Sequence, residues 1–166
     1  MRKVLDKWWL SWAVAVGLVV GAYGWLWWES SRPEPPLSRP YRTQAVCLLT
    51  GAEGVAGEQN RPVWTAMQRA SVETLVRAQF LEITGAQTVE NGRSYLPTLS
   101  QGNCGLVVAA DEIAIATVLD GAHSFPAQGF LIAGTGASQP NVIVVTSATV
   151  SDRIATEFVR LVPQEG

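Results

Sequence analysis

The sequence predicts an α/β protein in which an N-terminal transmembrane helix is followed by a domain with a five-stranded parallel sheet flanked by helices. Two observations lead to this prediction. Residues 8–28 are mostly apolar and contain no charged side chain. The rest of the chain alternates short apolar runs with segments of helical spacing. Such alternation is typical of parallel sheets, because helices connect successive strands and cover both faces.

Residues 8–28 are long enough to cross a membrane. A helix rises about 1.5 Å per residue, and the hydrocarbon core is about 30 Å thick. Six of the 7 Trp residues of the chain lie near the two ends of this segment. Indole rings favour the headgroup zone, so the pattern predicts two aromatic belts.

The charges before this segment predict its orientation. Residues 1–7 contain three basic side chains and one acidic side chain, and the positive-inside tendency places such a tail in the cytoplasm. A cleaved signal peptide, with Ala22 and Gly24 as its small residues, is the alternative. We expect a single-pass protein of the cell membrane whose C-terminal domain is extracytoplasmic.

Residues 29–40 are rich in proline and predict an extended, semi-stiff linker. Residues 41–166 then form one domain, large enough to bury its own core. The formal net charge of the chain is −2. Nucleic-acid binding normally needs a basic surface, so we expect no nucleic-acid partner.

Five short apolar runs predict the strands. Their lack of polar alternation is typical of strands that are buried on both faces of a parallel sheet. The predicted strands are residues 44–50, 77–84, 104–110, 130–133 and 142–145. Among small sheets with right-handed crossovers, the strand order 2-1-3-4-5 is the commonest, and we expect it here.

Four segments predict the helices between and after the strands. Pro62 suits a first helical turn, whereas Pro97 lies inside the second segment and weakens that prediction. The predicted helices are residues 62–70, 91–101, 111–122 and 151–161. A glycine-rich loop, residues 51–57, connects the first strand to the first helix.

Short motifs between residues 45 and 145 point to a family. They are Ala-Val-Cys-Leu-Leu-Thr at 45–50, Gly-Val-Ala-Gly-Glu-Gln-Asn at 54–60, Pro-Val-Trp-Thr-Ala-Met at 62–67, Tyr-Leu-Pro-Thr-Leu at 95–99, Cys-Gly-Leu-Val-Val-Ala at 104–109, His-Ser-Phe-Pro at 123–126, Phe-Leu-Ile-Ala at 130–133 and Pro-Asn-Val at 140–142. Together they resemble the basic membrane protein family. Its members have the type I periplasmic-binding-protein fold and are substrate-binding components of ABC transporters, often for nucleosides.

The resemblance implies one lobe of a two-lobed binding protein, with a nucleoside-like solute as ligand. In the family, a serine and a base-stacking phenylalanine in the first loop contact the ligand. In this chain Glu58 and Gln59 stand at those two positions, and only Asn60 matches the asparagine that follows them in the family. The resemblance therefore implies altered ligand contacts. One lobe buries only one side of a ligand, and tight sites bury most of it. Two lobes facing each other in a homodimer would rebuild a cleft.

The candidate binding residues follow from the predicted sheet, because ligands of open α/β sheets bind beyond the carboxyl ends of the strands. These candidates are Thr50, Glu53, Glu58, Asn60, Asp111, Glu112 and Thr135. For Asp111 and Glu112 the alternative role is to cap the following helix, where carboxylates are favourable.

Signals for catalysis and cofactors are weak. The glycines of residues 51–57 have the spacing G-x-x-G-x-x-G instead of the dinucleotide pattern G-x-G-x-x-G. No nucleophile motif accompanies His123, the only histidine. The cysteines fit no zinc pattern. We therefore expect no enzymatic activity, no cofactor and no metal site.

Cys47 and Cys104 fall on the first and third predicted strands, which are neighbours in the expected order. Adjacent strands lie about 4.8 Å apart, within the reach of a disulfide. Cys47 lies in the middle of its strand and Cys104 begins its own, so the register leaves the pairing open.

We expect a non-enzymatic extracytoplasmic domain that binds or senses a small solute. The alternative is an accessory membrane subunit whose lobe docks onto a protein partner. Trp64 is the only tryptophan outside residues 8–28, and we expect it to pack between helix and sheet.

Overall fold

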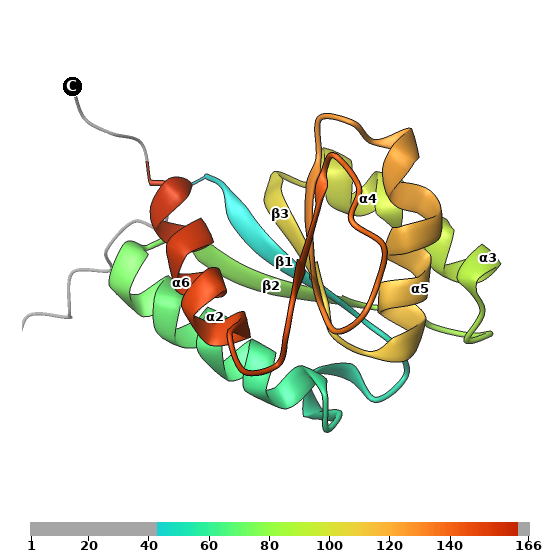
Figure 1. The fold of residues 1–166 in the computed structure, drawn as a ribbon, viewed down its shortest axis with the longest axis horizontal. Helices are drawn as coiled ribbons and strands as arrows, with labels where there is room; N and C mark the ends of the chain where they lie inside the picture. Colours follow the sequence, from blue (N-terminus) through green and yellow to red (C-terminus); the bar gives the residue numbers. More distant parts are fainter. Residues whose placement is uncertain (1–42, 163–166) are drawn as a thin grey trace, which may run out of the picture. The chain divides into compact units, whose positions relative to one another are not determined.

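The computed structural model describes residues 43–162, in which one parallel sheet lies between two layers of helices (Figure 1). The strand order is β2-β1-β3-β4-β5, which confirms the predicted five-stranded sheet of order 2-1-3-4-5. The strands are β1 (Ala45–Thr50), β2 (Arg77–Glu82), β3 (Cys104–Ala109), β4 (Gly129–Ala133) and β5 (Val142–Val145).

The helices divide between the two faces of the sheet, as Figure 1 shows. One face is covered by α2 (Asn60–Thr74) and α6 (Val150–Arg160), and the other by α4 (Leu96–Gln101) and α5 (Glu112–Gly121), with the short α3 (Val89–Arg93) beside α5. Two 3₁₀ turns, η1 (Gly54–Ala56) and η2 (Ala122–Ser124), complete the described elements.

Strand β1 explains why the apolar runs in the sequence lack alternation. All six of its residues are buried. Val46 and Leu48 face the core under α2 and α6, where they join Phe158. Cys47 and Leu49 face the opposite core, under α4 and α5. Both faces of the strand therefore need apolar side chains.

The edge strand β2 is covered less completely. Phe80 on this strand is 48% exposed. Trp64 of α2 packs edge-on against the Phe80 ring, with centroids 5.5 Å apart and an interplanar angle of 76°. Trp64 also packs against the core under α2 and α6. The predicted packing role of Trp64 between helix and sheet is confirmed.

The prediction of a single helix over residues 91–101 is wrong. The structure has two short helices here, α3 and α4, separated by a turn. Pro97 lies in the first turn of α4. Proline lacks an N–H and clashes with the preceding turn inside a helix, but it is tolerated at a helix start. A new helix therefore begins around Pro97.

The disulfide between Cys47 and Cys104 is present, with Cα atoms 5.7 Å apart. A bulge in β3 makes it possible. Ala45 pairs with Cys104 and Val46 pairs with Leu106, so Gly105 is an extra residue in the ladder. Side chains alternate across a regular strand, and the bulge at Gly105 interrupts this alternation, which places Cys104 on the same face as Cys47. Without it, Cys104 would share the face of Leu106.

The predicted fold class also included an N-terminal transmembrane helix, and the structure corrects this part. Among residues 43–162, no helix is both long and apolar enough to cross a membrane. The longest helix there, α2, has 15 residues and includes charged side chains, whereas a span needs about 20 apolar residues. Residues 8–28, the predicted span, lie outside the described residues, as do residues 1–7 and 29–40.

Replacing both cysteines, in the variant Cys47→Ala/Cys104→Ala, should lower the free energy of unfolding by about 2–4 kcal/mol, because the disulfide closes a long loop. The cysteines are separated by 57 positions in sequence. Urea denaturation of the unreduced protein and the variant measures the difference. The native protein in excess reductant should approach the stability of the variant. Two titratable thiols in the unfolded, unreduced protein would contradict the disulfide.

Candidate functional site

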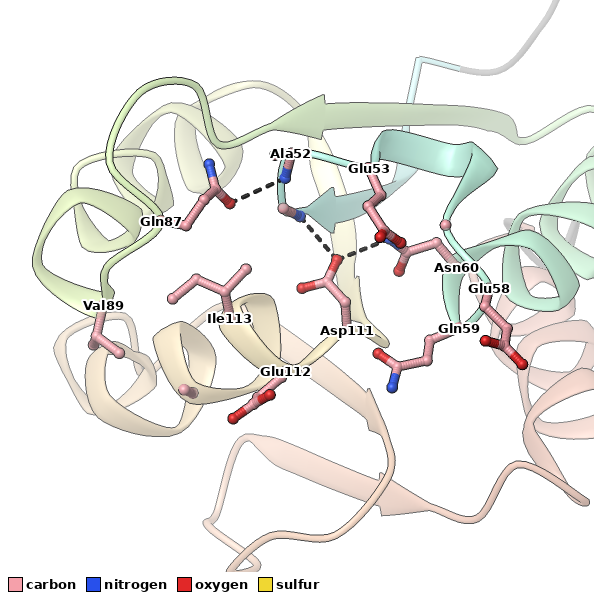
Figure 2. A pocket seen from close by; sticks show the side chains of 13 residues that line it. Ala52, Glu53, Glu58, Gln59, Asn60, Gln87, Val89, Asp111, Glu112 and Ile113 are labelled. Atoms are coloured by element: carbon pink, nitrogen blue, oxygen red, sulfur yellow. Dashed lines mark hydrogen bonds between the residues drawn. The ribbon is translucent and has the colours of Figure 1, made fainter.

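A pocket of about 750 Å³ opens at the carboxyl edge of the sheet, beyond the ends of β1 and β3 (Figure 2). Ligands of open parallel sheets bind at this edge. The lining residues come from the loop after β1, the start of α2, the segment after β2 and the start of α5. They are Gly51, Ala52, Glu53, Gly57, Glu58, Gln59, Asn60, Gln87, Val89, Asp111, Glu112, Ile113 and Ala116.

The carboxylate of Asp111 joins the separate walls of this pocket. Its Oδ1 atom accepts from the backbone N–H of Ala114 at 2.8 Å, so Asp111 caps the N-terminus of α5. Its Oδ2 atom accepts from the backbone N–H of Gly51, at 2.8 Å, and from Nδ2 of Asn60, also at 2.8 Å. Hydrogen bonds to a charged acceptor are roughly twice as strong as neutral ones. One side chain thus fixes the end of β1, the start of α2 and the start of α5.

Asn60 is only 1% exposed, and only the nitrogen of its side-chain amide forms hydrogen bonds among the described residues. Nδ2 donates to Asp111 and to the backbone carbonyl of Gly54, the latter at 2.8 Å. Both of these partners are acceptors, which fixes the orientation of the amide. The other atom, Oδ1, is buried and has no hydrogen-bond partner among the described residues. An unpaired buried acceptor costs free energy until a donor reaches it.

Two glycines let the loop after β1 adopt its path. A Cβ on Gly51 would lie 2.6 Å from Cγ2 of Ile113, so only glycine allows β1 to end this close to α5. Gly54 has a φ of +57°, a left-handed conformation that favours glycine. The glycine-rich sequence of residues 51–57 therefore serves close packing and a tight turn.

Gln87 is a pocket residue that the sequence analysis missed. Its Oε1 accepts from the backbone N–H of Ala52 at 3.0 Å, while its Nε2 donates to the carbonyls of Ile83 and Gly85. It therefore ties the segment after β2 to the loop after β1. Its position beyond the carboxyl end of β2 was the available signal, because neighbouring parallel strands end at the same edge.

The two ends of the pocket differ in character. Figure 2 shows Val89 and Ile113 at one end and Glu53, Glu58 and Asn60 at the other. The lining side chains include four carboxylates, those of Glu53, Glu58, Asp111 and Glu112, and no Lys, Arg or His. None of the four belongs to an ion pair within residues 43–162. The lining of the pocket therefore has a negative charge, and Arg61, which follows Asn60 on α2, donates to the carbonyl of Ala56 instead of pairing with a lining carboxylate.

Five of the seven predicted binding residues line the pocket: Glu53, Glu58, Asn60, Asp111 and Glu112. The other two do not. Thr50 is fully buried at the end of β1, and its hydroxyl donates a long 3.5 Å hydrogen bond to the carbonyl of Leu81. Thr135 is exposed after β4 and is not part of the pocket wall.

Other polar residues lie away from the pocket. His123 is exposed in η2 and is not a lining residue. Within the described part of the chain, no group of three or more His, Cys, Asp or Glu side chains is arranged to hold a metal ion. The pocket therefore offers carboxylates and amides to a ligand.

Comparison with known proteins shows the fold and no family. No protein-family model matches the chain, and no curated protein matches it. The basic membrane protein family is thus not shown. A candidate lipoprotein fragment from Peptoclostridium difficile 630 has a similar structure, with a TM-score of 0.59 and 17% identity over 70% of this chain and 97% of that one. At this identity the likeness shows the fold alone.

Two larger proteins share part of the architecture with TM-scores of 0.49. One is a transcriptional activator of the comK gene from Bacillus halodurans, with 14% identity over 60% of this chain and 33% of that one. The other is an ABC transporter solute-binding protein from Aeropyrum pernix K1, with 20% identity over 60% of this chain and 28% of that one. The chain thus spans a third or less of either protein. TM-scores below 0.5 support no inference about function.

Replacing Asp111 should destabilise the domain more than an ordinary helix cap does. Asp111→Ala leaves three donors without their acceptor, and we expect a loss of about 2–4 kcal/mol in the free energy of unfolding. The matched control is Thr88→Ala, because Thr88 caps α3 through a single bond to the N–H of Asn91. That control should cost about 1 kcal/mol or less. Equal losses in urea denaturation would show that Asp111 acts only as a cap.

Proposed function

We propose that this domain binds a small solute in the pocket at the carboxyl edge of its sheet, as a solute-binding or solute-sensing module. The observation that carries the proposal is the three-way contact of Asp111 with Gly51, Ala114 and Asn60. These bonds hold the walls of the pocket in place before a ligand arrives. Preorganised sites bind better because less ordering remains for the ligand to impose.

We propose that the pocket binds its ligand and does not catalyse a reaction. The lining side chains include no serine, cysteine or lysine nucleophile and no histidine. Serine, cysteine and lysine nucleophiles act beside a base, and the lining residues offer no such pair. The carboxylates and amides present are groups that orient a ligand by hydrogen bonds and charge.

We also propose an extracytoplasmic location for the domain. The bond between Cys47 and Cys104 supports it, because disulfides persist in oxidising compartments and are rare in the cytosol.

A more specific hypothesis is that the domain binds a nucleoside for an ABC transporter. This hypothesis rests on the resemblance of motifs in residues 45–145 to the basic membrane protein family. The pocket gives a nucleoside little support, because its lining residues include no aromatic ring on which a base could stack. We therefore propose solute binding without assigning a nucleoside.

A thermal-shift screen of the purified full-length protein tests the proposal. The panel should contain nucleosides, sugars, carboxylates and amines at high concentration. A ligand at 100 times its dissociation constant stabilises a protein by about 2.7 kcal/mol, which raises Tm by several degrees.

The variant Ala116→Leu narrows the pocket and should reduce that shift. Its matched control is Ala155→Leu, at an exposed position of α6 outside the pocket, which should keep it. If no compound shifts Tm, solute binding is wrong. Co-purification with a stable protein partner would then support the accessory-subunit alternative.

A further inference from the structure

We propose that the pocket selects an organic ammonium cation, a molecule with a protonated amine at one end and an apolar body at the other. This inference rests on the proposed solute binding and names the class of solute. Charge, an unpaired acceptor and the apolar wall of the pocket support it independently.

The charge of the pocket favours a cation. Four residues with carboxylate side chains line the pocket, and no basic residue is among the lining residues. Like charges that share a cleft repel one another, and a cleft of one sign concentrates ions of the opposite sign. An anionic ligand would add to the repulsion, whereas an ammonium group would relieve it.

A second observation, at the end of the pocket lined by Glu53, Glu58 and Asn60, indicates that the ligand supplies a hydrogen-bond donor. The Oδ1 atom of Asn60 is buried and unpaired. The Glu53 carboxylate lies near the Asn60 amide, as Figure 2 shows. Both groups border Gly57: a Cβ built on this glycine would be 2.9 Å from Glu53 Oε2 and 3.4 Å from Asn60 Nδ2. Glu53 is an exposed side chain, so it can turn to admit a ligand. An ammonium group has three N–H donors and no acceptor, which suits an amide oxygen beside carboxylates.

The helix N-termini at this edge do not turn the site into an anion site. The start of α5 carries a partial positive charge that would attract an anion. Asp111 already supplies the negative charge and accepts the N–H of Ala114. Glu112 adds a second carboxylate in the first turn. The protein has thus filled the anion-binding position with its own side chains.

The remainder of the pocket suits an organic cation better than a metal ion. Val89, Ile113 and Ala116 form an apolar stretch of the wall, and Figure 2 shows Val89 and Ile113 away from Glu53 and Glu58. Apolar surface binds hydrocarbon and not a hydrated ion. Among the described residues, no acidic group has the arrangement of a metal site.

A matched series of probes tests this inference on the full-length protein. Hexylamine, 1-hexanol and hexanoate share one alkyl chain and differ in charge, and 2-phenylethylamine and uridine extend the set. By calorimetry, hexylamine or 2-phenylethylamine should bind at least about tenfold more tightly than 1-hexanol, a difference of about 1.4 kcal/mol. Hexanoate should show no binding. Amine affinity should fall between 20 and 300 mM NaCl, because salt screens charge attraction.

The double variant Glu53→Gln/Glu58→Gln tests the role of charge. Both side chains are exposed and have no bonding partner in the described chain, so neutralising them should leave the fold intact. Amine affinity should fall about five- to tenfold, as for the loss of two partly exposed charge contacts. The control Glu73→Gln/Asp152→Asn changes the net charge equally at exposed positions outside the pocket and should keep the affinity.

NMR tests the proposed donor contact directly. The side-chain amide resonances of Asn60 should move when hexylamine is added, and they should stay in place with 1-hexanol at the same concentration. Unmoved Asn60 resonances with a bound amine would overturn the contact with Oδ1.

The outcomes separate this inference from the proposed function. If uridine, 1-hexanol or hexanoate binds as tightly as the amines, or only Mg²⁺ or Ca²⁺ binds, the ammonium class is wrong. If uridine, 1-hexanol or hexanoate binds and the variant Ala116→Leu weakens that binding, the ligand occupies the pocket. The proposed solute-binding function would then remain supported. If neither this series nor the screening panel binds, the proposed function itself is wrong.

Discussion

The carboxylate of Asp111 is the interaction on which the carboxyl edge of this domain depends. It accepts hydrogen bonds from Gly51, from Asn60 and from Ala114. These donors belong to the end of β1, the start of α2 and the start of α5. Two further bonds at this edge, Asn60 Nδ2 to the carbonyl of Gly54 and the N–H of Ala52 to Gln87, add to those of Asp111. A single charged acceptor therefore turns three chain segments into one wall.

The neighbouring strands β1 and β3 are linked at two levels of the sheet. Near the amino end of β3, the disulfide links Cys104 to Cys47 of β1. At the carboxyl end, Asp111 follows β3 and receives the N–H of Gly51, which follows β1. Covalent and charged contacts at two levels of a strand pair oppose its local opening. The base of the pocket is thus its most rigid part, and adaptation to a ligand is left to exposed side chains such as Glu53.

The sequence predicted the strands well because their chemistry is simple. A strand such as β1, buried on both faces, must be apolar throughout, and that pattern is visible without coordinates. The same reasoning selected Glu53, Asn60 and Asp111, since residues after parallel strands share one edge. It failed for the helix over residues 91–101, where Pro97 marks a beginning and not a weak interior.

Other features depend on contacts that no local pattern reveals. Gln87 enters the pocket through a bond to Ala52, 35 positions away in sequence. The unpaired oxygen of Asn60 becomes visible only when every neighbour is in place. The predicted transmembrane helix rested on the length and apolar character of residues 8–28, which lie outside the described residues, and the described helices include none of that kind.

The extra residue in β3 has an evolutionary consequence. The bulge at Gly105 keeps Cys104 on the face of Cys47, and the missing side chain of Gly105 leaves room for Leu161 just after α6, since a Cβ there would be 2.8 Å from Leu161 Cδ2. A larger side chain at position 105 would displace Leu161 unless a smaller residue stood at position 161. Among homologous chains, the residues at positions 105 and 161 should therefore vary together, with glycine at 105 wherever a large side chain stands at 161.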